Sequence, residues 1–308
     1  MTNSFLYATT VLIWGTTWYA IIFQLGVVSP EVSIVWRFIS ASLILFGWCL
    51  IRGKNLRFSR RQHCWMVLQG CFLFSGNYLV FYFATGFVTS GLVAVSFSMI
   101  ILFNISLGAL FFAQPVRPRV AISAVIGLAG IALLFLPELK GFNLEDEGFR
   151  GMMLCIGGTA LASVGNLISG RNQCSGLPVI QTNAWGMLYG SMVSATVALL
   201  LGRDFIIDWQ APYLLSLVYL SLFGTVFGFG AYLTLLGRIG ADRAAYATVL
   251  FPLVALLLST LFENYHWTPL AAGGVVLVVF GNILALKPSR RAALDGRLKE
   301  PAKRSRDE

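Results

Sequence analysis

The chain has 308 residues, of which 57% are hydrophobic and only 11% are charged, and its mean hydropathy is +0.77. Soluble proteins usually contain about 25% charged residues, so this composition excludes an ordinary soluble domain. The formal net charge of +9 could suggest nucleic-acid binding. The basic residues, however, lie in the connections between apolar stretches and form no continuous stripe that could face phosphates, so we expect no nucleic-acid partner.

Apolar stretches of about twenty residues follow one another along nearly the whole chain. As a helix that rises about 1.5 Å per residue, each stretch is long enough to cross about 30 Å of hydrocarbon. The sequence therefore predicts an all-α integral membrane protein. The ten predicted transmembrane helices are residues 4–26, 31–51, 64–85, 90–113, 118–137, 149–170, 179–201, 211–236, 243–263 and 268–286.

The predicted spans divide equally between the two halves of the chain. We expect a first five-helix repeat in residues 1–141, a second in residues 142–288, and a basic, disordered cytoplasmic tail in residues 289–308. Because five is odd, the second repeat must lie in the membrane the opposite way up. Such inverted repeats are typical of secondary transporters, which open alternately to the two sides around a site between the halves.

The positive charges predict the orientation in the membrane. Most of the 22 Lys and Arg residues follow even-numbered spans, as in residues 52–61 and 287–306. Apart from Arg37 within the second span, Lys140, Arg150 and Arg203 are the ones that fall on the opposite side. Because positive loops mark the cytoplasmic face, we expect both termini in the cytoplasm.

Short motifs in the first half keep the order and spacing of one known family. They are Trp14-Gly15 near the centre of the first span, Pro30, Arg37-Phe38 and Ala41 in the second, residues 81–84 (FYFA) and 89–94 (TSGLVA) across the third and fourth, and a weaker echo at residues 240–245 (GADRAA). With these motifs, about residues 5–286 resemble the EamA-like family of the drug/metabolite transporter superfamily.

The resemblance implies a secondary transporter in the inner membrane of a bacterium. Its expected activity is the export of amino acids, aromatic or apolar, by alternating access, with a small-molecule substrate, contact with membrane lipid and no cofactor. The alternative is a carrier that takes up another metabolite, such as a nucleotide-like solute. The sequence leaves the direction open, because the net flux through a carrier follows the gradients on its substrate and coupling ion.

A membrane-embedded enzyme is a remote alternative. Such an enzyme needs a nucleophile with a base, or a cluster of metal ligands. The sequence has no HExxH motif, no GxSxG motif with suitable partners and no pair of carboxylates within the spans. A receptor or scaffold would not need an inverted repeat. We therefore expect no catalytic or metal-binding residues.

Two positions depart from the pattern of the family. The fourth span of each half usually ends in an acidic Gly-Glu pair, and the second half keeps Glu263, whereas the first half has Ala113-Gln114-Pro115. A proline of the same span is kept in the second half alone, as Pro252, where we expect it to kink the helix. A mechanism that depends on a carboxylate at the first position is therefore not expected.

Arg37 is the one ionisable side chain well inside a predicted span, whereas Glu31, Asp242 and Glu263 lie at helix ends. A charge inside the membrane costs several kcal/mol unless it faces a partner or water. Arg37 either binds a carboxylate or phosphate of the substrate, or it has a structural role in which it snorkels outward or bonds backbone carbonyls to hold the first two spans together. Because no carboxylate lies deep, facilitated or electrically driven transport is favoured over proton antiport, and Glu31 and Glu263 remain the candidate coupling residues.

Uncharged polar and aromatic side chains crowd the middle of several spans, which predicts a cavity for a small amphipathic solute whose ring stacks on Trp or Tyr. Contacts between helices could satisfy many of these groups instead. The spacings Gly186/Gly190 and Gly224/Gly228 predict close helix packing within one chain, so they indicate no dimer. The candidate substrate-binding residues are Trp14, Thr17, Trp18, Arg37, Asn77, Tyr78, Tyr82, Ser98, Asn166, Trp185, Tyr232 and Tyr246.

Overall fold

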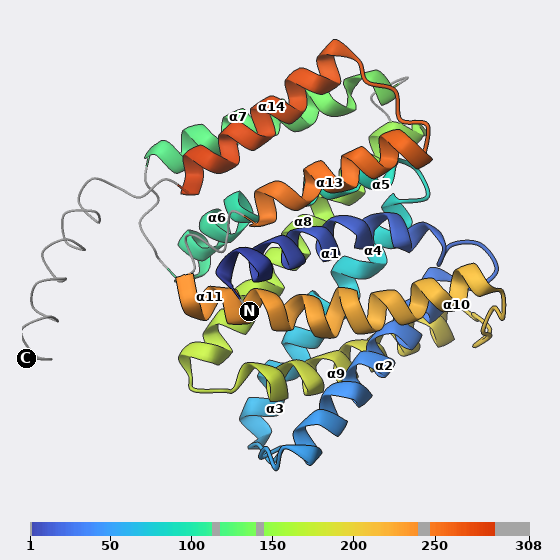
Figure 1. Cartoon of the computed structure of the whole chain (residues 1–308), viewed down its shortest axis with the longest axis vertical. Coiled ribbons are helices and arrows are strands. Elements are labelled where there is room, and N and C mark those ends of the chain that lie inside the picture. The colour runs from blue at the N-terminus through green and yellow to red at the C-terminus, as the bar shows by residue number, and fades with distance from the viewer. Residues whose placement is uncertain (1, 113–117, 140–144, 240–246, 287–308) are drawn as a thin grey trace, which may run out of the picture.

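The computed structural model describes residues 2–112, 118–139, 145–239 and 247–286, and every regular element in these ranges is a helix (Figure 1). The predicted all-helical class is thereby confirmed. The unbroken helices are α1 (Asn3–Ile22), α2 (Pro30–Ile51), α7 (Pro118–Phe135), the short 3-10 helix η2 (Leu136–Glu138), α8 (Glu147–Cys174), α9 (Val179–Leu200), α13 (Ala247–Phe262) and α14 (Pro269–Leu286).

Other segments are shorter helices joined end to end. The first is α3 (Arg60–Cys71), the π-helix η1 (Phe72–Gly76) and α4 (Asn77–Ala84), and the second is α5 (Ser90–Phe97) and α6 (Ile100–Phe112). The third is α10 (Ala211–Val218), the π-helix η3 (Tyr219–Phe227) and α11 (Gly228–Ile239). Each predicted span thus overlaps a helical segment, but the sequence did not predict these breaks.

The helix ends follow from local sequence. Ser59 and Gln62 form a reciprocal capping box at the start of α3, which satisfies backbone N–H groups that have no partner within the helix. Gly53, Gly176 and Gly202 follow the last residues of α2, α8 and α9 with φ of 59°, 78° and 65°. Only glycine adopts this left-handed conformation without a steric cost, so these residues can end each helix and reverse the chain.

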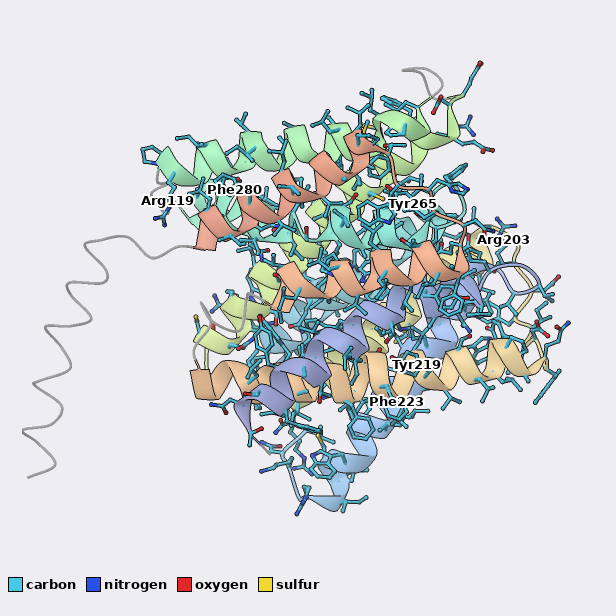
Figure 2. All side chains as sticks on the ribbon, turned by 45° about the horizontal axis from the view of Figure 1, so that its top comes forward. Arg119, Arg203, Tyr219, Phe223, Tyr265 and Phe280 are labelled. Atoms are coloured by element: carbon cyan, nitrogen blue, oxygen red, sulfur yellow. The ribbon has the colours of Figure 1, made fainter. Side chains whose placement is uncertain are left out.

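Within the described residues, six helical segments are long and apolar enough to cross a membrane, as judged by length and composition. They are Asn3–Ile22, Pro30–Ile51, Arg60–Ala84, Ser90–Phe111, Glu147–Cys174 and Ala211–Tyr232. Shorter apolar helices cover Ala121–Phe135, Ala247–Phe262 and Pro269–Ala285. Large apolar side chains such as Phe223 and Phe280 are exposed on the outside of the bundle (Figure 2), as expected for a protein whose surface meets lipid rather than water.

Helices of the two halves of the chain pack against each other in pairs. α7 lies along α14, α2 packs against α9, and α5 packs against α13 (Figure 1). Small residues allow the close approach: a Cβ on Gly130 of α7 would lie 2.8 Å from the carbonyl oxygen of Gly274 in α14. Gly186 and Gly190 of α9 lie against α3 and η1 of the same chain, where a Cβ on Gly70 would lie 2.5 Å from the Gly186 oxygen.

The helix is not interrupted at Pro252, and the predicted kink there stays a prediction. α13 is assigned as one α-helix through Pro252, and the irregular backbone lies in η1, in η3 and between α5 and α6. Proline removes a hydrogen-bond donor, but the neighbouring α-helical turns continue on both sides of it. Gln114, Pro115 and Asp242, which the sequence comparison singled out, lie outside the described residues.

Candidate functional site

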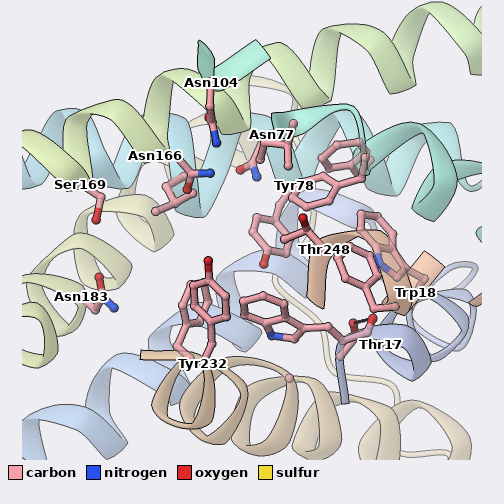
Figure 3. Close-up of a pocket in the computed structure, with 18 of the residues that line it drawn as sticks. Thr17, Trp18, Asn77, Tyr78, Asn104, Asn166, Ser169, Asn183, Tyr232 and Thr248 are labelled. Carbon is pink, nitrogen blue, oxygen red and sulfur yellow. Dashed lines mark hydrogen bonds between the residues drawn. The ribbon is translucent and has the colours of Figure 1, made fainter. Parts of the chain in front are cut away.

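A cavity of about 340 Å³ lies between helices from both halves of the chain (Figure 3). It reaches the turn between α8 and α9, where Ser169, Gln173 and Asn183 line it. At its other end the rings of Trp18, Phe81, Phe97 and Phe251 pack on one another, with centroid separations between 5.3 and 6.4 Å. The cavity therefore extends toward one end of the bundle and is filled by aromatic side chains toward the other.

Most of the predicted substrate-binding residues line this cavity. These are Trp14, Thr17, Trp18, Arg37, Asn77, Tyr78, Asn166 and Tyr232. They come from α1, α2, α4, α8 and α11, so the folded chain brings together residues that are far apart in sequence. Tyr246 lies outside the described residues.

The other predicted site residues lie elsewhere. Tyr82 is buried behind the cavity wall, and its hydroxyl accepts a hydrogen bond from Arg37 at 3.4 Å. Ser98 lies between α5 and α6 and accepts a bond from the Asn282 side chain of α14. Trp185 stacks on Tyr189 and donates to the backbone oxygen of Leu56, so its contacts join α9 to the segment before α3.

Arg37 lies in α2 with only 2% of its surface exposed. Its guanidinium carbon is 4.7 Å from the centre of the Tyr78 ring, and its Nε donates a long hydrogen bond of 3.4 Å to Thr225. Among the described residues no carboxylate lies within ion-pair distance of it. The same carbon also lies 5.4 Å from the centre of the Phe38 ring. A buried guanidinium with five donors is therefore held by two aromatic rings and two long hydrogen bonds and has no anionic partner among the described residues, which leaves its charge largely uncompensated.

The two π-helices flank Arg37. Asn77 and Tyr78 follow η1 directly, and Gly224 and Thr225 belong to η3. The Thr225 hydroxyl donates to the Leu220 oxygen five residues earlier, so it ties down the widened turn while also accepting from Arg37. π-helical turns are often found at functional sites, and these two interrupt segments that occupy equivalent third places in the two predicted repeats.

One wall of the cavity is aromatic. Trp14 packs on Tyr232, with ring centroids 5.0 Å apart, and contacts Phe229 at 5.6 Å. Close packing of α1 on η3 and α11 depends on glycine here, because a Cβ on Gly224 or Gly228 would lie within 2.7 Å of Thr17 or Trp14. The rings therefore form a continuous apolar surface beside the guanidinium.

The opposite wall carries amides and hydroxyls. Asn104, Asn166, Ser169 and Asn183 lie along it, across the cavity from Trp18 and Thr17 (Figure 3). The set of candidate residues derived from the sequence omitted Asn104, Ser169 and Asn183, as well as Gln173. A usable signal for Asn183 was present, since Gln181, Thr182 and Asn183 are consecutive polar residues in the first turns of an otherwise apolar helix.

The two carboxylates considered for ion coupling lie away from the cavity lining. Glu31 is fully buried in the first turn of α2, with its Oε1 3.7 Å from Nε of Arg203. Glu263 accepts hydrogen bonds from the backbone N–H of Ser90 at 2.9 Å, from the Ser259 hydroxyl at 2.6 Å and from the Ser90 hydroxyl. In the part of the chain that the structure describes, no group of three or more His, Cys, Asp or Glu residues could hold a metal ion.

Apolar helices that surround a cavity with one aromatic and one polar wall are the arrangement expected of a membrane transporter of small molecules. The sequence profile of the EamA-like transporter family matches residues 2–136 and again residues 149–287. The chain belongs to this family, so the resemblance seen in its motifs is confirmed, and it is a transporter rather than an enzyme.

Curated relatives agree with this assignment, and a solved structure shares the fold. The chain is 28% identical to an uncharacterized inner membrane transporter, YedA, of Escherichia coli, over 89% of each chain, and 22% identical to the protein PagO of Salmonella typhimurium, over 92% of each. It is 26% identical to a probable amino-acid metabolite efflux pump of Salmonella typhimurium, over 63% of this chain and 67% of that one. A protein crystal structure superposes with a TM-score of 0.66 at 19% identity, covering 92% of this chain and 96% of that chain, which shows a shared fold.

Proposed function

We propose that this protein exports aromatic or apolar amino acids across the bacterial inner membrane by alternating access. In this proposal ten helices cross the membrane as two inverted five-helix repeats, residues 1–141 and 142–288, with both termini in the cytoplasm. The double match of the family profile supports the repeats. So does the pairing of α2 with α9, α5 with α13 and α7 with α14, because each pair joins helices at equivalent places in the two repeats.

The uncompensated charge of Arg37 carries the proposal for the substrate. A carboxylate in the cavity would offset the cost of the buried guanidinium and could accept two parallel hydrogen bonds from it. Among the cavity-lining residues that the structure describes, Arg37 is the one Lys or Arg side chain. One such charge suits a monocarboxylate and disfavours a multiply charged solute such as a nucleotide.

The aromatic wall supports an aromatic or apolar side chain on the substrate. Trp14, Tyr78 and Tyr232 offer ring faces and edges beside Arg37, and aromatic pairs add about 0.5–1.5 kcal/mol beyond the burial of their area. A volume of about 340 Å³ lies in the range of small-molecule sites, about 300–1,000 Å³. The relative named as a probable amino-acid metabolite efflux pump adds independent support.

The cavity lining offers little for proton coupling. No Asp, Glu or His stands among its described residues, and membrane carriers that couple to protons commonly use such groups. We therefore propose facilitated or electrically driven export. The cavity reaches the α8–α9 turn, which the charge pattern assigns to the cytoplasmic side, so this conformation corresponds to the inward-facing one in the proposal.

Efflux from proteoliposomes tests the proposed function. Purified protein is reconstituted into vesicles loaded in parallel with radiolabelled Phe, Trp, Leu, Thr or a nucleotide sugar, with and without an imposed proton gradient. Saturable efflux of Phe, Trp and Leu that does not require the gradient is expected. Retention of all amino acids, movement of the nucleotide sugar alone, or a strict requirement for protons would contradict the proposal.

A further inference from the structure

A chain of four hydrogen-bonded side chains leads from the end of α8 to the polar wall of the cavity. We call Arg171, Asn172, Gln69 and Asn183 the amide relay. Arg171 Nη1 donates to Asn172 Oδ1 at 3.3 Å, Asn172 Nδ2 donates to Gln69 Oε1 at 2.9 Å, and Gln69 Nε2 donates to Asn183 Oδ1 at 2.9 Å. Asn172 and Gln69 are fully buried.

The arginine fixes the direction of every bond in the amide relay. A guanidinium can only donate, so Asn172 must turn its oxygen toward Arg171 and its nitrogen toward Gln69. Gln69 must in turn direct its oxygen toward Asn172 and its nitrogen toward the oxygen of Asn183. Arg171 itself is held over the Trp65 ring, with its guanidinium carbon 3.9 Å from the ring centroid. Reversing any one amide would leave buried polar atoms without partners, at a cost of about 1–3 kcal/mol for each.

Asn183 is the free end of the amide relay and lines the cavity. Because Gln69 donates to its oxygen, the Asn183 amide is oriented with the oxygen toward Gln69, and the polar group that it offers to a substrate is its N–H donor. The Asn104 amide is oriented in the same way, since the Ser163 hydroxyl donates to its oxygen at 2.8 Å. The polar wall thus offers donors to a substrate at these two positions.

Arg37 and Asn183 lie toward opposite ends of the cavity. A Cβ on Gly224 would lie 2.7 Å from Thr17 and 3.6 Å from Arg37, so the guanidinium lies near Thr17, and Figure 3 shows Asn183 at the end away from Thr17. A substrate whose carboxylate contacts Arg37 would therefore direct its side chain toward Asn183.

We propose that Asn183 binds a hydrogen-bond acceptor at the far end of the substrate side chain, and that Gln69 is a positioning residue that holds the Asn183 N–H toward it. This inference rests on the proposed export of amino acids and specifies the preferred class: those whose apolar or aromatic side chain ends in an acceptor oxygen. Phenylalanine offers no such atom, whereas 4-methoxyphenylalanine offers an acceptor without a donor.

The ratio of 4-methoxyphenylalanine to phenylalanine efflux tests the inference in wild-type proteoliposomes and in two variants. One hydrogen bond predicts a wild-type ratio of about three to ten. Asn183→Asp still accepts from Gln69 but can no longer donate, so the ratio should fall to about one or below. Gln69→Glu leaves Asn183 itself unchanged. The introduced carboxylate can only accept, so the Asn183 N–H turns toward it and the Asn183 oxygen turns toward the cavity. The ratio should therefore fall in the same way.

Asn282→Asp is the matched control, because Asn282 is a fully buried amide that bonds Ser98 outside the cavity lining. Its ratio should stay at the wild-type value. An unchanged ratio in Asn183→Asp, or a wild-type ratio of one, would overturn the inference while amino-acid efflux itself still supported the proposed function.

Thermal stabilisation of the purified protein by the same two amino acids tests the inference about Asn183 separately from the proposed export function. If wild type moves no amino acid, the proposed function fails. The inference then stands only if 4-methoxyphenylalanine stabilises wild type more than phenylalanine does and Asn183→Asp removes the difference. Equal stabilisation, or none, would overturn it.

Discussion

In the proposed function, the guanidinium of Arg37 binds the carboxylate of the substrate, and this contact depends on the planar shape of the side chain as well as on its charge. Lysine keeps the charge but loses the planar fork and the face that packs on Tyr78. Because hydrogen bonds to charged groups contribute about 1.5–3 kcal/mol, Arg37→Lys should lower amino-acid efflux from proteoliposomes by about ten- to a hundredfold. Arg203→Lys, at a side chain that is 48% exposed, is the control and should transport normally. Wild-type efflux from Arg37→Lys would show that the substrate does not contact the guanidinium.

At the same scale, the sequence could identify Arg37 but only part of the polar wall. A charge within an apolar span is costly, so its presence alone is informative. Amides and aromatic rings cost less to bury than a charged side chain, and they serve packing as readily as binding. For this reason the residues predicted from the sequence included Trp185, which packs on Tyr189, and omitted Asn183, which lines the cavity. Residue type does not give the direction in which a side chain points.

At the scale of the element, hydropathy located the helices but could not locate η1 and η3. A π-helical turn depends on backbone hydrogen bonds from the N–H of one residue to the carbonyl five residues before it. In η3 the Thr225 side-chain hydroxyl also bonds to the Leu220 oxygen, but an apolar composition is the same in both helix types. The glycine spacings were more informative. They predicted close helix contacts within the chain, and Gly186, Gly190, Gly224 and Gly228 all lie at such contacts.

Alanine substitutions at two glycines test this packing, because they should change the stability of the protein in opposite directions. A Cβ at Gly70 would meet the backbone oxygen of Gly186 at 2.5 Å, whereas a Cβ at Gly157 would meet nothing within 4 Å. Gly70→Ala should force α3 and α9 apart and cost about 1–3 kcal/mol. Gly157→Ala should stabilise α8 by about 0.5–1 kcal/mol. Melting temperatures of the purified variants should therefore fall and rise, respectively, and a stable Gly70→Ala protein would contradict the observed helix spacing.

At the scale of the whole molecule, the proposed inverted repeat requires an even number of membrane crossings. A reporter that is active only in the cytoplasm, fused after Glu308, should be active, and one that is active only outside the cytoplasm should not. Fusion of the same reporters within residues 203–209, between α9 and α10, should give the reverse result. Activity of the external reporter at the C-terminus would contradict the proposed orientation, and together with a cytoplasmic N-terminus it would break the even count and with it the proposed repeat.

The proposed alternating access, with this conformation facing inward, further requires that contacts close the outer end of the cavity in this conformation and open in the other. Glu263 at the end of α13 joins Ser90 at the start of α5 and so links the two halves on the side away from the α8–α9 turn. Removing this carboxylate leaves the Ser90 N–H without its partner and weakens the closed outer end, so Glu263→Ala should shift the population toward the outward-open state.

Labelling of Thr17→Cys by an impermeant thiol reagent measures that shift. Thr17 lines the cavity, and Cys64 and Cys174, the exposed native cysteines, are first replaced by serine. In right-side-out vesicles, Glu263→Ala should raise the rate of labelling from outside by several-fold, whereas Glu147→Ala, which removes an exposed carboxylate from the start of α8, should leave it unchanged. Because the same substitution would lower the rate of labelling from the cytoplasmic side, opposite changes in the two rates identify a conformational shift. Equal increases on both sides would instead indicate local unfolding and would contradict a role for Glu263 in closing the outer end.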